Sequence, residues 1–154
     1  MTAKNQLNLR AKEVAIEVIE RGLGYDPLAF EPLLNSGKLH LELSDEEDDL
    51  KEKVRLLETG IARLNSAIEL YDKDYYLFNI RGYAFWQLGH IQGGAGGEFL
   101  KRAVSDYQAS LKINPNSDTY VSLAKLLAEY AKINSELQIQ LLNQAIDAIE
   151  ESIK

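Results

Sequence analysis

Cysteine is absent from the 154-residue sequence, which excludes disulfide bridges, zinc-thiolate sites, iron–sulfur clusters and a cysteine nucleophile. Proline and glycine are scarce, with three and ten residues, so the chain has few of the turns that a many-stranded sheet requires. No run approaches the roughly 18 apolar residues of a membrane span, and no signal-peptide pattern opens the sequence. We therefore expect a cytoplasmic protein with no membrane partner.

Basic residues are also few: the sequence has 17 basic and 24 acidic residues, and its net charge is −7. Nucleic-acid binding depends on clustered lysine and arginine, so nucleic acid is not an expected partner. The remaining composition, 45% hydrophobic and 27% charged, is ordinary for a globular protein. The length predicts a single domain over residues 1–154.

Apolar residues recur at intervals of three and four along most of the chain, which predicts amphipathic helices. Residues 36–43 are expected to be irregular or briefly extended. The turn Asn114–Ser117 is expected to cap the helix that follows it. Six or seven helices with almost no strand predict an all-α fold. Besides the long helix discussed next, the expected helices are 5–21, 27–35 with an interruption at Pro32, 75–89, 98–112, 118–132 and 135–153.

The clearest helix is expected to begin after Ser44, which has Glu47 three residues later in the spacing of a capping box. It would contain some 27 residues and span roughly 40 Å. Its heptad spacing predicts packing inside the domain, with self-association as the alternative. Seven apolar residues would share one face: Leu50, Val54, Leu57, Ile61, Leu64, Ile68 and Tyr71.

Three later segments repeat one pattern of small and apolar residues at spacings of four, three and five. They are Gly60-Leu64-Ala67-Asp72, Ala103-Tyr107-Ser110-Pro115 and Gln138-Leu142-Ala145-Glu150. Helices that would precede the last two share a spacing of four and then three: Phe78-Gly82-Phe85 and Val121-Lys125-Ala128. Small residues at such places allow two helices to approach closely, so each pair predicts a helical hairpin.

This pattern resembles the tetratricopeptide repeat (TPR), whose signature is W-x2-L-G-x2-Y…A-x3-F…P over about 34 residues. The resemblance covers residues 58–154 and is best over 74–117. Arg81 stands where leucine is usual, and Lys125 where glycine is usual. From Asp72 to Pro115 the repeat takes 43 residues, because a flexible insertion with the glycine run Gly93–Gly97 separates its helices.

The resemblance implies a short right-handed α-solenoid of stacked hairpins over 45–154, with capping helices in 1–44. It also implies a concave groove lined by the first helix of each hairpin. Tyrosine and tryptophan are common anchors of protein interfaces, and amides bond a peptide backbone. Core packing is the alternative for these aromatics. Groove candidates are Tyr76, Asn79, Tyr83, Trp86 and Gln87 on the best unit, and Thr119, Ser122, Leu126, Glu129 and Tyr130 on the next.

The sequence gives little support for a chaperone-tail, metal, phosphate or catalytic site. Ile80, Thr119 and Leu123 stand where related repeats place the lysine, arginine and asparagine that hold chaperone tails, so such a tail is not expected. The histidines His40 and His90 lack metal-ligand spacing and are expected to be structural or surface residues. Glu98 follows the glycine run and would repel a phosphate. We expect no catalytic residue, metal or cofactor.

The favoured function is therefore a non-catalytic adaptor or chaperone that binds a protein or peptide in the groove. Segment 42–58, with eight acidic and three basic residues, supports an alternative. In that case the protein is an acidic inhibitor or immunity-type protein that neutralises a basic partner by charge. A structural role through self-association of the heptad helix is the third hypothesis.

Overall fold

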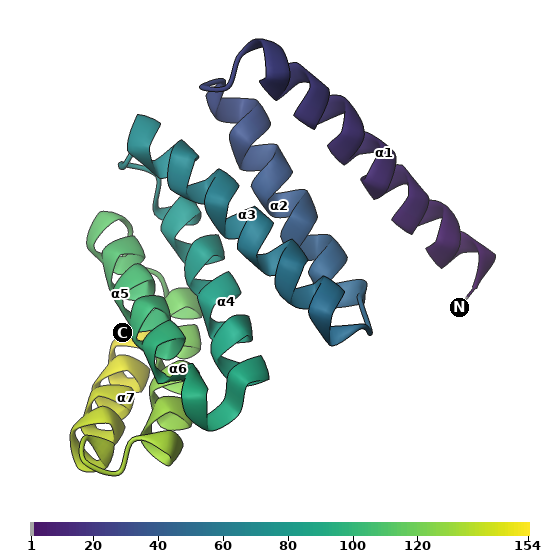
Figure 1. The fold of residues 1–154 in the computed structure, drawn as a ribbon. Coiled ribbons are helices and arrows are strands. Elements are labelled where there is room, and N and C mark those ends of the chain that lie inside the picture. The colour runs from purple at the N-terminus through teal and green to yellow at the C-terminus, as the bar shows by residue number, and fades with distance from the viewer. Residues whose placement is uncertain (1) are drawn as a thin grey trace. The chain divides into compact units, whose positions relative to one another are not determined.

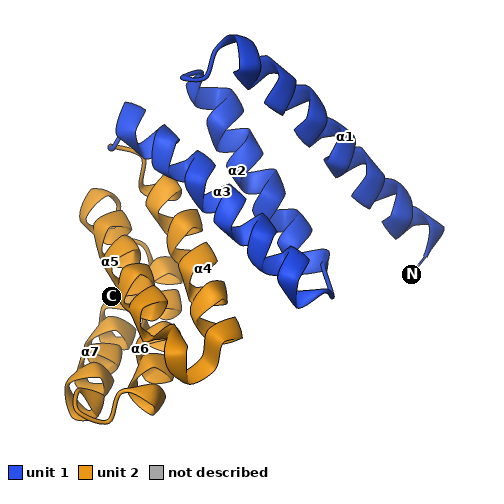
Figure 2. Cartoon of the chain, in the orientation of Figure 1, with its two compact units in different colours: residues 1–72 blue, residues 73–154 orange. Residues whose placement is uncertain are grey.

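The computed structural model describes residues 2–154 as helices joined by short turns, and they form two compact units (Figures 1 and 2). No strand occurs in the described part of the chain, which confirms the predicted all-α class. Unit 1 spans Met1–Asp72 and unit 2 spans Lys73–Lys154. The organisation of residues 1–154 as one domain stays a prediction.

Unit 1 contains α1 (Ala3–Tyr25), α2 (Phe30–Glu46) and α3 (Leu50–Leu70), with α2 packed against both other helices. The expected interruption at Pro32 and the irregular segment 36–43 are wrong, because α2 is continuous. Ala29 is the N-cap, which places Pro32 in the first turn. Backbone N–H groups there have no acceptor inside the helix, so proline removes no helical hydrogen bond.

The predicted cap of α3 is also wrong. Ser44 lies inside α2, fully buried, and its hydroxyl donates to the Leu41 carbonyl at 2.7 Å. Asp49 caps α3 instead, with its carboxylate accepting from the Glu52 N–H at 2.9 Å. The helix has 21 residues rather than about 27. The middle of its apolar stripe is buried within unit 1, as the packing interpretation predicts, while both ends, Leu50 and Tyr71, are exposed.

Unit 2 contains two hairpins, and α5 of the first packs on α6 of the second. The first consists of α4 (Tyr75–Gln92), a 3-10 helix η1 (Gly93–Gly96) and α5 (Gly97–Ile113); the second of α6 (Ser117–Ile133) and α7 (Gln138–Ser152). Asn116 caps α6 by accepting from the Thr119 N–H at 2.9 Å, which confirms the predicted cap.

The glycine run forms η1 and the first residue of α5, so it is folded rather than an irregular insertion. Gly93 has a φ of 56°, a conformation that favours glycine. Gly96 lies directly on the backbone of Gly89, where a Cβ atom would be 2.1 Å from the Gly89 carbonyl oxygen. The extra residues therefore close the α4–α5 hairpin by a tight backbone contact.

Candidate functional site

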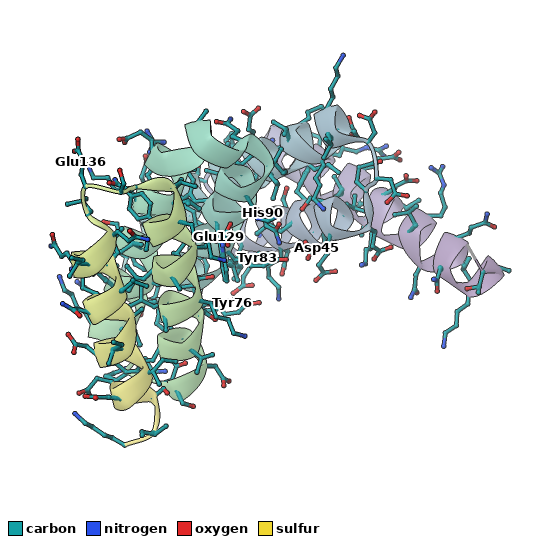
Figure 3. All side chains as sticks on the ribbon, turned by 90° about the horizontal axis from the view of Figure 1, so that it is seen from below. Asp45, Tyr76, Tyr83, His90, Glu129 and Glu136 are labelled. Atoms are coloured by element: carbon teal, nitrogen blue, oxygen red, sulfur yellow. The ribbon has the colours of Figure 1, made fainter. Side chains whose placement is uncertain are left out.

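The candidate site is built mainly from one face of α4. Asp74 begins this helix, its carboxylate accepting from the Tyr76 N–H at 2.9 Å. From Tyr76 the spacing of seven, four and three residues brings Tyr83, Gln87 and His90 to the same face of the helix. Figure 3 shows Tyr76, Tyr83 and His90 on one side of unit 2, together with Glu129 of α6.

Five residues line a pocket of about 280 Å³, called here the α4–α6 pocket: Tyr83, Trp86, Gln87, His90 and Glu129. Each carboxylate oxygen of Glu129 lies within hydrogen-bonding distance of a different ring nitrogen of α4. Trp86 Nε1 donates to one at 2.7 Å, and His90 Nδ1 lies 2.8 Å from the other. Gln87 Nε2 donates to the Tyr83 hydroxyl at 2.7 Å. The pocket therefore has aromatic sides and a carboxylate held in a defined position.

The charge of Glu129 follows from these contacts. Partial burial raises the pKa of its carboxyl group, but the hydrogen bonds with His90 and Trp86 and the electrostatic interactions with His90 and Lys132 lower it by more. The net result is a pKa below the ordinary value, so Glu129 is ionised at neutral pH. In the His90–Glu129 pair, the side chain of His90 is 72% exposed and that of Glu129 is 29% exposed, so His90 is the member that faces solvent.

Two further contacts hold α4 in place. Asn79 Nδ2 donates to the Thr119 hydroxyl at 2.7 Å, which links α4 to α6. Arg81 makes two hydrogen bonds to Asp106 of α5, at 2.8 and 2.7 Å, and its guanidinium lies over the rings of Phe78 and Phe85. This pair explains why arginine can occupy the place where leucine is usual in the repeat.

The structure brings together four of the predicted groove residues, namely Tyr83, Trp86, Gln87 and Glu129. Tyr76 is exposed on α4 but does not line the pocket. Asn79 is engaged with Thr119, which is itself buried. Ser122 is half-buried on α6 and also lies outside the pocket lining.

Two predicted groove residues need correction. Leu126 is fully buried and Tyr130 is 9% exposed. With Thr119 and Leu123 they occupy the buried side of α6, at a spacing of four, three and four residues. Their side chains hold the helices of unit 2 together and are not available to a ligand.

His90 is expected to be a structural or surface residue, and its side chain is 72% exposed. It also lines the α4–α6 pocket, because it follows Gln87 by three residues and Tyr83 by seven and so shares their helical face. No group of three or more His, Cys, Asp or Glu residues that could hold a metal ion occurs within residues 2–154. Over the same range, no helix is long and apolar enough to cross a membrane.

Acidic residues of segment 42–58 are largely engaged inside unit 1. Lys12 lies 2.6 Å from Glu46 and 3.4 Å from Glu42, and these contacts outweigh desolvation to raise the Lys12 pKa. Glu52 pairs with Arg55, and Asp49 caps α3. The segment therefore presents less free negative charge than its composition suggests.

No family model matches the sequence, and a comparison with curated proteins finds no match either. Several solved structures are similar in fold. A MamA structure described as MSR-1 C2 is 15% identical, with a TM-score of 0.65, over 92% of this chain and 70% of that chain. A second MamA crystal structure is 15% identical, with a TM-score of 0.59, over 99% and 94% of the two chains.

The third is TTC0263, a thermophilic TPR protein from Thermus thermophilus. It is 19% identical with a TM-score of 0.62, over 96% of this chain and 78% of that chain. Identities this low bear on the fold and not on the partner. The helical hairpins, their repeated spacing and these neighbours agree, and the chain has the helical-repeat fold of tetratricopeptide repeat proteins.

Proposed function

We propose that this protein is a non-catalytic interaction module that binds a peptide or a helix of a protein partner along α4 and α6. The observation that carries the proposal is the α4–α6 pocket, in which Tyr83 and Trp86 stand beside the ionised Glu129. Aromatic side chains offer large contact areas together with a polar group, which is why they are enriched among interface residues that dominate binding. An adaptor or chaperone role, in the cytoplasm, follows as a prediction.

The pocket chemistry also limits what can enter it. Glu129 is an acceptor held against the aromatic face of α4 by Trp86 and His90, so the best occupant is a partner side chain that donates hydrogen bonds and carries positive charge. Lysine and arginine meet both conditions. We therefore expect a partner segment with a basic residue at the point that contacts Trp86.

The test is capture of the partner from a lysate of the native organism, with wild-type protein compared with Trp86→Ala at low and moderate salt. If Trp86 is an anchor, its loss weakens binding by about 2 kcal/mol or more, and the partner is no longer retained. Tyr71→Ala is the matched control, because Tyr71 is an exposed aromatic residue of unit 1. The captured partner is then titrated against purified wild type and both variants, with Trp86, the single tryptophan, as a fluorescent reporter in the proteins that retain it.

The same experiment examines the acidic-inhibitor alternative. Asp48 and Glu58 remain outside the ion pairs described above, in segment 42–58, and Glu58 is exposed. Under that alternative, Asp48→Asn combined with Glu58→Gln loses the partner, while Trp86→Ala retains it. Moderate salt would also strip the partner, because exposed charges are screened over about 10 Å at 0.1 M ionic strength. That result would contradict recognition at the α4–α6 pocket.

A further inference from the structure

The α4–α6 pocket contains one acid–base pair, His90 and Glu129, whose members come from different helices (Figure 3). His90 Nδ1 lies 2.8 Å from one carboxylate oxygen of Glu129, and Trp86 Nε1 donates to the other at 2.7 Å. The two contacts differ in charge. The indole N–H of tryptophan is a permanent, uncharged donor, whereas the imidazole of histidine gains a positive charge when it binds a proton. The charge of the pocket therefore depends on the protonation of His90.

Other charged groups near the pair keep their charge or lie elsewhere. Lys132 of α6 acts on Glu129 through its charge, is not a lining residue, and stays positive over the neutral and mildly acid range. On the other side of α4, Arg102 and Asp106 of α5 contact that helix outside the pocket lining. The 3-10 helix η1, which also packs on α4, has no titratable side chain. Among the described residues that line the pocket, His90 is thus the group that titrates near neutral pH.

The pocket has two charge states. Glu129 stays ionised at mildly acid pH, because its pKa lies below the ordinary value of 4.5. With His90 protonated, the pair is neutral, and both carboxylate oxygens accept from donors of the protein itself. With His90 neutral, the carboxylate keeps its negative charge, and the imidazole can turn its single N–H toward water, because its side chain is 72% exposed. The second state is the one that offers a carboxylate to an incoming cation.

We propose that the proton on His90 competes with the basic residue of the partner for Glu129, so that the α4–α6 pocket binds a cation at neutral pH and releases it on acidification. This inference rests on the proposed function, because it concerns the basic occupant of the same pocket. The competition is reciprocal, so a bound cation also opposes protonation of His90. Histidine is mostly neutral at about pH 7.5 and mostly protonated at about pH 5.5, so affinity for a cation should fall about tenfold between these values.

Two substitutions hold the pocket in one charge state each. His90→Gln keeps an amide N–H that can donate to Glu129 but carries no charge, so its affinity for a cation should not change between the two pH values. His90→Arg is positively charged at both, so it should bind a cation weakly at both. The exposed side chain of His90 lies in the last turn of α4, so both variants should fold, and far-ultraviolet circular dichroism verifies this.

The experiment is a nuclear magnetic resonance titration that follows the indole N–H of Trp86, the single tryptophan. Without ligand, this resonance should shift between the two pH values in wild type and stay in place in His90→Gln, because Glu129 links the two rings. The binding probe is N-acetyl-arginine amide, which has a guanidinium group and no carboxylate. Its uncharged analogue, N-acetyl-citrulline amide, is the matched control. In wild type the arginine probe should bind about tenfold more weakly at the lower pH, and binding of the citrulline probe should not change.

The outcomes separate this inference from the proposed function. A tenfold loss in wild type that is absent from His90→Gln supports the inference. Equal binding of the arginine probe by wild type at both pH values would overturn the inference and leave the pocket as a cation site. A loss that persists in His90→Gln would also overturn it, because another group, such as the second histidine His40, would be responsible. If the arginine probe binds at neither pH, the pocket takes no cation, and the basic occupant of the proposed function is wrong together with this inference.

Discussion

The two units each contain an arginine–carboxylate pair that joins two helices, and the pairs differ in burial. In unit 1, Arg63 of α3 donates to both oxygens of Glu20 of α1, and their side chains are 35% and 29% exposed. In unit 2, Arg81 of α4 donates to both oxygens of Asp106 of α5, and their side chains are 19% and 7% exposed. The chemistry is the same, but water reaches one pair and scarcely reaches the other.

The carboxyl groups respond in opposite directions. Burial raises the pKa of Glu20, but the Ser36 hydroxyl, the Arg63 guanidinium and nearby positive charge together lower it below the ordinary value. Burial raises the pKa of Asp106 as well, and there the two hydrogen bonds and the charge of Arg81 do not compensate. The comparison shows that an ion pair inside unit 2 is retained at an electrostatic cost, whereas the pair of unit 1 favours the charged carboxylate.

Removing the arginine of each pair should produce the largest difference in stability between the two units. Arg81→Met leaves the buried Asp106 without its partner, and the free energy of unfolding should fall by about 3–5 kcal/mol. Arg63→Met leaves Glu20 within reach of water and of Ser36 at 2.6 Å, and the loss should be about 1 kcal/mol or less. Urea unfolding at pH 7 measures both. Equal losses would show that burial of the pair does not decide its importance.

Close helix contacts provide the second comparison. Gly96→Ala in unit 2 directs a Cβ atom against the backbone of Gly89, which cannot move aside, so we expect a loss of about 1–3 kcal/mol or more. Gly37→Ala in unit 1 meets the side chain of Leu64 at 2.8 Å, while the nearest backbone atom, the Gly60 carbonyl oxygen, lies at 3.4 Å, so it should cost less. Thermal unfolding of both variants is the measurement.

Gly94→Ala is the control for this pair, because nothing lies within 4 Å of the added Cβ atom. It should be close to neutral. A Gly37→Ala variant that is less stable than Gly96→Ala would mean that the α2–α3 contact is the more rigid of the two.

The repeat in unit 1 was partly readable from sequence. Leu33, Gly37 and His40 have the spacing of four and then three seen at Phe78, Gly82 and Phe85, yet Pro32 indicated a break. A proline in the first turn has the opposite meaning from one inside a helix, and only the position of the N-cap distinguishes them. Ser44 and Asp49 are both residue types that cap helices, and each has a glutamate three residues later. Ser44 is buried inside α2, and Asp49 is the residue that caps α3.

For the candidate site too, helical spacing predicts some of the residues, and the rest depend on tertiary packing. Helical spacing on α4 was enough to predict that Tyr83, Trp86 and Gln87 lie close together, and it also contained His90. Spacing alone did not separate Glu129 from its neighbours Leu126 and Tyr130. That separation depends on which side of α6 meets the other helices of unit 2, a property of tertiary packing rather than of local sequence.

The smallest predicted effect uses pH to compare the two carboxyl groups. The pKa of Glu20 is lowered from 4.5, so its pairing contributes stability that is present above the ordinary value and lost as the pH falls through the lowered one. The pKa of Asp106 is raised from 3.8, so folding favours its protonated form, and that contribution is present at acid pH and lost as the pH rises through the raised value.

Acidification should therefore destabilise Glu20→Gln less than wild type and Asp106→Asn more than wild type. Both differences should be small, because each shift is the net result of opposed causes. Urea midpoints of the three proteins at pH 7 and at a pH below both ordinary values measure the two differences. Parallel losses would show that the two pairs respond to protons alike, and that burial does not separate unit 2 from unit 1 electrostatically.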